Sequence, residues 1–226
     1  MSEQTGTELA DAYRRTQARI IELMRSAASE DLERIVPACP DWTVQDLVAH
    51  VVSIPAALAA GDLPTGDLEL WLQGLVEARR GAVLADLLDE WVALDATTVS
   101  LLAGPGEVLF GDLAVHEHDV RGALGRPDHA ALEVDAMLPR TVAAFASPLR
   151  EAGLGAIEVR DGDQVWRSHD AEPGWTLLVD PWEATRALNS RRTADELRRL
   201  PAVGEVEPYL RVVHEHLPLP AASLAE

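Results

Sequence analysis

The stretch GDLAVHEHDVRGAL (residues 111–124) joins a helical pattern of apolar residues to a run of acidic and imidazole side chains. At about 100° per residue, His116 falls on the apolar face of this helix, and Asp112 lies one turn before it on the same face. His118 is about 200° away from His116 and cannot bind the same metal. The pattern predicts a helix over about 107–124 that carries Asp112 and His116 toward a core.

An earlier stretch, CPDWTVQDLVAHV (39–51), predicts a second core helix over about 43–60. Thr43 and Asp46 have the spacing of a capping box, with Asp in place of the usual Glu or Gln. His50 lies within the apolar stripe of this helix. The stripe consists of Leu47, Val51, Ile54 and Leu58.

These two inward faces hold three side chains of metal-ligand type, His50, Asp112 and His116. Burying an unpaired carboxylate is unfavourable, and a cation shared with two imidazoles offsets that penalty. Three protein ligands with an open fourth position describe a catalytic rather than a structural zinc site. The alternative interpretations are a hydrogen-bonded core histidine at position 50 and an internal Asp112–His116 hydrogen bond.

The remaining candidate ligands are expected to lie elsewhere. Seven helical steps separate Thr43 from His50, about 10 Å along the axis, so Cys39 is expected at the far end of that helix. The second HEH triplet, residues 214–216, lies in a short polar segment and is expected on the surface.

The pattern of apolar and polar residues changes near Gly155, from helical periodicity to the alternation typical of strands. We therefore expect a mainly α protein with a helical bundle over 1–152 and a small α+β domain over 153–226. Further helices are expected from the capping box Thr5–Glu8 onward and over about 68–79, 82–103, 134–152, 182–189 and 193–200, with the break after 103 at Gly104–Gly106. Strands are expected over 157–160, 164–167 and 175–179.

Composition excludes several classes of function. The 226 residues contain one cysteine, no lysine and a formal net charge of −19. Nucleic acid is therefore an unfavourable partner, and Schiff-base or P-loop lysine chemistry is excluded. No apolar run reaches the roughly 18 residues of a membrane span, and the N-terminus is unlike a secretory signal. A cytoplasmic protein without membrane contact is expected.

The motifs at 39–51 and 112–127 resemble those of the mycothiol-dependent maleylpyruvate isomerase family, a branch of the DinB-like metal-binding bundles. The segment SRRTADELRRL (190–200) also resembles the smaller domain of that family. The resemblance implies a DinB-like four-helix bundle followed by a small α+β C-terminal domain. It also implies a divalent metal, usually zinc, held by His50, Asp112 and His116. The family usually has glutamate where this chain has Asp112.

The resemblance further implies a metal- and mycothiol-dependent isomerase or transferase that acts on a small electrophile. A carboxylate on this substrate could be held by Arg191 or Arg192 through bidentate pairing; the alternative is that these are solvated surface arginines. Asp119 could then accept a hydrogen bond from an imidazole of the site. The alternative hypothesis is a non-catalytic metal-binding or ligand-sensing protein. A third, a metal-free structural bundle, predicts that removing His50 changes stability alone. The lysine-free composition suits actinobacteria, which make mycothiol.

Overall fold

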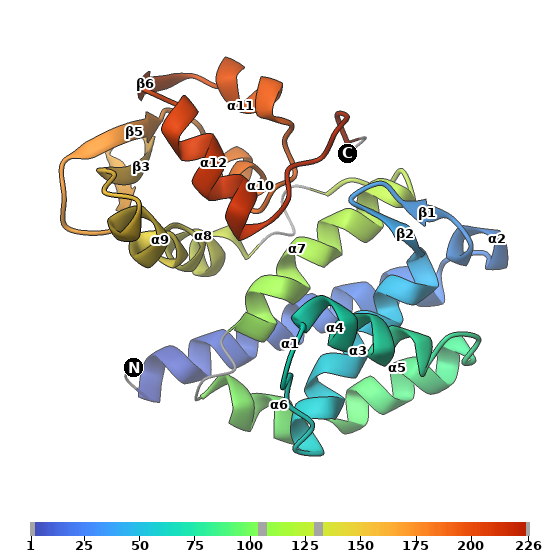
Figure 1. Ribbon diagram of the computed structural model, residues 1–226. Helices are drawn as coiled ribbons and strands as arrows, with labels where there is room; N and C mark the ends of the chain where they lie inside the picture. The colour runs from blue at the N-terminus through green and yellow to red at the C-terminus, as the bar shows by residue number, and fades with distance from the viewer. Residues whose placement is uncertain (1–2, 104–107, 129–132, 225–226) are drawn as a thin grey trace. The chain divides into compact units, whose positions relative to one another are not determined.

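The computed structural model describes residues 3–103, 108–128 and 133–224, and the chain is mainly helical with a small sheet region (Figure 1). It divides into two compact units, Met1–Asp128 with Glu226, and His129–Ala225. Among the described helices, none combines the length and the apolar character needed to cross a membrane.

The first unit is built from helices and one short hairpin. Its elements are α1 (Glu3–Arg25), α2 (Ser29–Leu32), β1 (Ile35–Val36), β2 (Cys39–Thr43), α3 (Val44–Ala59), α4 (Leu68–Glu77), α5 (Leu84–Ala93), α6 (Asp95–Leu102) and α7 (Val108–Ala123). Helix α7 packs against α1 and α3, and the α5–α6 pair packs against α3 (Figure 1). Large apolar side chains such as Trp91, Phe110 and Leu113 are almost fully buried between these helices.

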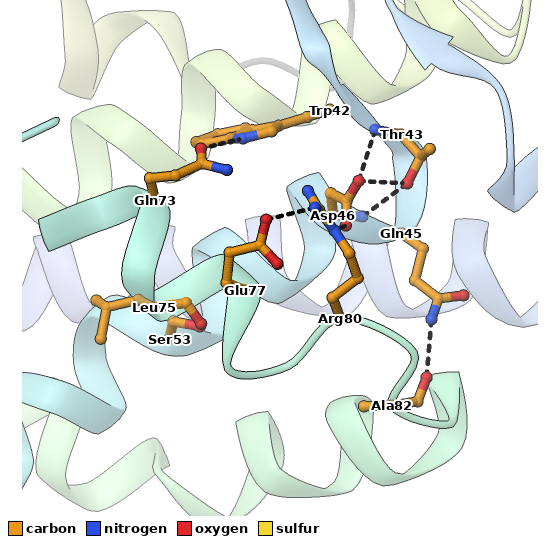
Figure 2. Close-up of polar contacts among 10 residues, drawn as sticks. All are labelled: Trp42, Thr43, Gln45, Asp46, Ser53, Gln73, Leu75, Glu77, Arg80 and Ala82. Carbon is orange, nitrogen blue, oxygen red and sulfur yellow. Dashed lines mark hydrogen bonds and ion pairs between the residues drawn. The ribbon is translucent and has the colours of Figure 1, made fainter. Parts of the chain in front are cut away.

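Helix α3 begins where the sequence predicts. The Thr43 hydroxyl accepts a hydrogen bond from the Asp46 backbone amide, and the Asp46 carboxylate accepts one from the Thr43 amide (Figure 2). This reciprocal capping box confirms the pattern predicted for these two residues. Pro55 lies inside α3, which nevertheless continues to Ala59.

Other boundaries differ from expectation. Helix α1 already begins at Glu3, so Thr5 is not its cap. The single helix expected over 82–103 is divided at Leu94 into α5 and α6. The break expected at 104–106 lies outside the described residues.

The segment that contains Pro37 and Pro40 forms a short hairpin before α3. Strands β1 and β2 are antiparallel, with Ile35 opposite Thr43 and Val36 opposite Cys39. The chain therefore reverses direction just before α3, and β1 contacts α7. This reversal places the start of β2 beside the helical core rather than beyond the end of α3.

Helix α7 is buried on every side from Leu113 to Val120, and Leu109 and Phe110 are buried as well. Its polar residues therefore need partners inside the unit. Glu117, which is 1% exposed, accepts hydrogen bonds from the guanidinium groups of Arg19 on α1 and Arg121 on α7, at 2.8–3.1 Å. This buried ion cluster joins α1 to α7.

The second unit combines a four-stranded sheet with helices. Its elements are α8 (Val134–Ala144), α9 (Ala146–Glu151), β3 (Ala156–Asp161), β4 (Gln164–Arg167), β5 (Pro173–Leu177), α10 (Pro181–Leu188), α11 (Ala194–Arg199), β6 (Ala202–Gly204) and α12 (Glu207–His216). The strand order is β4-β3-β5-β6; β3 and β5 are parallel and the other pairs are antiparallel. The three expected strands are present, whereas β6 and α12 were not expected.

The division between the units falls after Asp128 rather than at the expected boundary of 152/153. The helix expected over 134–152 is present as α8 and α9, but it belongs to the second unit. Leu138, Val142 and Leu149 are buried in one apolar core with residues of the sheet and of α12. Burial of this apolar face against the sheet explains the earlier boundary.

Candidate metal centre

Helices α3 and α7 bring His50, Asp112 and His116 together. One ligand atom from each of the three residues lies within 4.8 Å of the other two. The Asp112 Oδ1 atom is 3.3 Å from His50 Nε2 and 3.4 Å from His116 Nε2. The two imidazole rings meet edge to face, with centroids 5.0 Å apart. The three residues that the sequence singles out therefore converge around one carboxylate oxygen.

These separations fit a bound ion. Two ligands bound at about 2.0–2.1 Å in tetrahedral geometry lie roughly 3.3–3.4 Å apart. The two nitrogen–oxygen distances, 3.3 and 3.4 Å, match that spacing and exceed the usual length of a charged hydrogen bond, about 2.7–2.9 Å. Although aspartate is one methylene shorter than the glutamate usual in the resembling family, Asp112 approaches both imidazoles. The donor set, two nitrogens and one carboxylate oxygen, suits zinc and similar divalent ions.

A second carboxylate orients the His116 ring. Asp119 Oδ2 lies 3.0 Å from His116 Nδ1, and Asp119 is only 3% exposed. When Nδ1 carries the proton, its N–H group donates a hydrogen bond to Asp119. The lone pair of Nε2 is then directed toward Asp112 and His50. This is the partner that the sequence analysis assigns to Asp119.

The electrostatics of the cluster are strongly coupled. Burial alone would raise the pKa of the Asp112 carboxyl, but the positive charges of His50 and His116 outweigh burial and hold that pKa far below its usual range. Burial alone would lower the pKa of His116, but the Asp112 charge and hydrogen bonds to Asp112 and Asp119 raise it well above its usual value. The centre thus attracts a positive charge, which a proton or a metal ion can supply.

Trp42 covers the His50 side of the centre. Its ring lies 4.7 Å from the His50 ring between centroids, and its indole nitrogen donates to Gln73 of α4 at 3.1 Å (Figure 2). His50 Nδ1 is buried and has no hydrogen-bond partner among the described residues. The indole thereby shields His50 from solvent and ties the centre to α4.

Solvent reaches the centre mainly at Asp112. The Asp112 side chain is 29% exposed, compared with 3% for His50 and 10% for His116. Two ligands are therefore held in a dry environment and the third borders solvent. An incoming small molecule would approach from the Asp112 side.

The structure overturns the expectation for Cys39. Its sulfur lies within 4.8 Å of ligand atoms of His116 and Asp119, so it is close to the centre rather than at the far end of α3. The helical distance from Thr43 to His50 assumes that the chain continues outward, whereas β2 pairs with β1, and β1 contacts α7. The closely spaced Pro37 and Pro40 were the signal for a reversal, since proline favours turns.

The other candidate ligands belong to neither ligand group of the described residues. His118 is buried on α7 but belongs to neither potential ligand group of the described residues. His214, Glu215 and His216 are exposed at the end of α12, as expected for the second triplet, although in a helix rather than a polar loop.

Arg191 and Arg192 lie between α10 and α11 of the second unit. The Arg192 guanidinium makes two hydrogen bonds to the Glu183 carboxylate, both 2.7 Å long. Arg191 is 9% exposed and donates to the backbone oxygen of Asn189. Both guanidinium groups therefore already contribute to the structure of the second unit.

Comparisons with protein-family models, with curated proteins and with solved structures returned no match for this chain. The metal centre therefore rests on its own geometry: two imidazole nitrogens and one carboxylate oxygen, within 4.8 Å of one another, on two helices of one core.

Proposed function

We propose that this chain is a divalent-metal-dependent, mycothiol-dependent isomerase or transferase of the maleylpyruvate isomerase family, with a DinB-like bundle as its first unit. The observation that carries the proposal is the convergence of His50, Asp112 and His116 at the spacing of metal ligands. The resemblance of the motifs at 39–51 and 112–127 supports the choice of thiol chemistry. The proposed setting is the cytoplasm, where small thiols are reduced.

When bound, a divalent cation, zinc in this proposal, lowers the pKa of a coordinated thiol so that a thiolate forms near neutral pH. The residues of the chain supply the rest. His50 and His116 would hold the cation, each through a ring nitrogen, and Asp112 would contribute the negative charge that balances it. Asp119 holds the proton of His116 at Nδ1, and Trp42 excludes water from the His50 side.

The proposed substrate is a small electrophile that carries a carboxylate. It would enter from the side of Asp112, the ligand that borders solvent. Its carboxylate would be held by Arg191 or Arg192. For Arg192 this role requires that Glu183 release the guanidinium it now binds.

The second candidate function is a non-catalytic metal-binding or ligand-sensing protein. The observation that favours it is Asp112, where the resembling family usually has glutamate. Both candidates require the ion, so they differ only in whether a bound thiol is turned over.

The test is the metal content per chain of the purified protein, measured by mass spectrometry. We expect about one ion per chain in the wild type and none in His50→Ala or His116→Ala. His118→Ala is the matched control, because it removes a buried histidine of α7 that belongs to neither ligand group. Absence of an ion after reconstitution with zinc, or its retention in both ligand variants, contradicts the proposal.

Turnover separates the two candidates. The metal-loaded wild type is assayed with a panel of activated alkenes, with and without mycothiol. Thiol-dependent isomerisation or addition supports the enzyme. A protein that binds one ion and converts none of the panel supports the sensing function instead.

A further inference from the structure

A second group of potential ligands lies on the opposite edge of the His116 ring. The Cys39 sulfur, a His116 nitrogen and an Asp119 carboxylate oxygen lie within 4.8 Å of one another. His116 and Asp119 are 8% and 3% exposed, and Cys39 is half-buried. The strand β2 supplies the sulfur, and α7 supplies the other two groups.

Asp112 and Asp119, one from each group, face different nitrogens of the shared imidazole. His116 Nε2 lies 3.4 Å from Asp112 Oδ1, on the side of His50. His116 Nδ1 lies 3.0 Å from Asp119 Oδ2, in the group that contains Cys39. One ring thus connects a site with two nitrogens and one oxygen to a site with a sulfur.

A neutral imidazole has one lone pair and one N–H. A cation bound at Nε2 leaves the proton on Nδ1, where Asp119 accepts its hydrogen bond. A cation bound at Nδ1 leaves the proton on Nε2, and Asp112 then accepts a hydrogen bond from that N–H group. Both arrangements satisfy the ring, but a neutral His116 can serve only one cation at a time.

The geometry points to a second metal position at Cys39, His116 and Asp119, which is an alternative to the first and selects thiophilic ions. Thiolate ligands favour soft ions such as Cd²⁺, whereas imidazole and carboxylate ligands favour harder or borderline ions. A thiophilic ion therefore binds through Cys39 and removes His116 from the first group. This inference does not depend on the first position being catalytic.

The experiment is a titration of the full-length protein with Cd²⁺, followed by the ultraviolet thiolate-to-cadmium charge-transfer absorption and by metal content. The wild type is expected to bind one Cd²⁺ per chain with this absorption. Because the chain has one cysteine, the absorption reports Cys39 alone. Cys39→Ser is expected to abolish the absorption and to weaken Cd²⁺ binding about tenfold or more, because it removes the soft ligand.

His50→Ala is the matched variant, since it removes a ligand of the first group only. It is expected to keep the cadmium absorption while losing zinc, whereas Cys39→Ser keeps zinc. Circular dichroism of each variant checks that the helices are retained. Cd²⁺ bound by the wild type without charge-transfer absorption overturns the second position. Two Cd²⁺ ions bound through His116 at once overturn the exclusive choice.

The second metal position and the proposed function can fail independently in these experiments. Zinc that is lost in His50→Ala and kept in Cys39→Ser supports the first position even where cadmium gives no thiolate absorption. Conversely, a cadmium–thiolate absorption in a protein that binds no zinc supports the second position alone.

Discussion

Two faces of α7 each carry a carboxylate that is neutralised by neighbouring side chains, and the two are neutralised in different ways. Asp112 faces two imidazole nitrogens at 3.3 and 3.4 Å. Glu117 faces two guanidinium groups, with four N–H···O distances of 2.8–3.1 Å. A guanidinium carries its charge permanently, whereas an imidazole can exchange a proton for a metal ion.

The difference separates a structural ion cluster from an exchangeable one on the same helix. At Glu117 the hydrogen bonds are short and the arginines supply the counter-charge themselves. At Asp112 the spacing is that of ligands around an ion, and the positive charge can come from outside the chain. Removing each carboxylate should therefore affect a different property of the protein.

The largest effect is expected for Glu117→Ala. Removing this carboxylate leaves Arg19 and Arg121 without their shared counter-ion in a mostly buried position, so unit 1 should lose about 3 kcal/mol of unfolding free energy. Urea unfolding of the metal-free protein measures this loss.

The matched variant for that comparison is Asp112→Ala. It should abolish zinc binding at the group of His50, Asp112 and His116. In the metal-free protein it should lower the unfolding free energy less than Glu117→Ala does, because His50 and His116 can lose their protons whereas arginines cannot. A larger destabilisation for Asp112→Ala than for Glu117→Ala would reverse the distinction between the two clusters.

An intermediate effect is expected for Asp119→Asn. Because Asp119 accepts the Nδ1 proton of His116, its loss should weaken zinc binding by about 10–100-fold. Calorimetric titration with zinc measures the change. Asp89→Asn, at an exposed position of α5, serves as the control and should leave the affinity unchanged. Equal affinities for wild type and Asp119→Asn would show that the ring is oriented without this bond.

The smallest effect extends the comparison to the second unit. Glu158 is 0% exposed and accepts hydrogen bonds from Arg160 and Arg167. Burial alone would raise the pKa of Glu158, but the two arginines outweigh burial and lower it. The pKa is thus lower in the folded than in the unfolded chain. The resulting stabilisation is present above about pH 4.3 and is lost as the pH falls through the folded value.

Glu158→Gln should consequently reduce the unfolding free energy by about 1 kcal/mol near neutral pH, because the arginines are partly solvated. The difference from the wild type should shrink as the pH is lowered toward 3. Denaturant unfolding at a series of pH values checks this. A difference that is independent of pH would mean that the charge of Glu158 does not contribute.

The features that the sequence predicts correctly depend on local patterns. Helical periodicity places His50, Asp112 and His116 on inward faces, because one helix determines which residues share a side. The capping box of Thr43 and Asp46 is likewise a matter of four consecutive residues. The strands expected over 157–160 and 164–167 are present as β3 and β4, because the alternation of apolar and polar residues is also a local pattern.

The features that were missed depend on contacts between distant segments. Cys39 and His116 are brought together by the packing of β1 on α7, which no local pattern encodes. The apolar residues of α8 have the same periodicity whether they pack on a bundle or on a sheet, so the boundary between units could not be read from them. Likewise, α12 was obscured by the polar HEH triplet, although Leu210 and Val213 bury its other face.

The separation of 62 residues between His50 and Asp112 gives the proposed ion a further effect. An ion held by both residues closes a loop that contains α4, α5 and α6, and acts as a removable cross-link. At a free-ion concentration of about 100 times the dissociation constant, preferential binding to the folded state adds about 2.7 kcal/mol. The resistance of the first unit to unfolding would then vary with the metal supply of the cell.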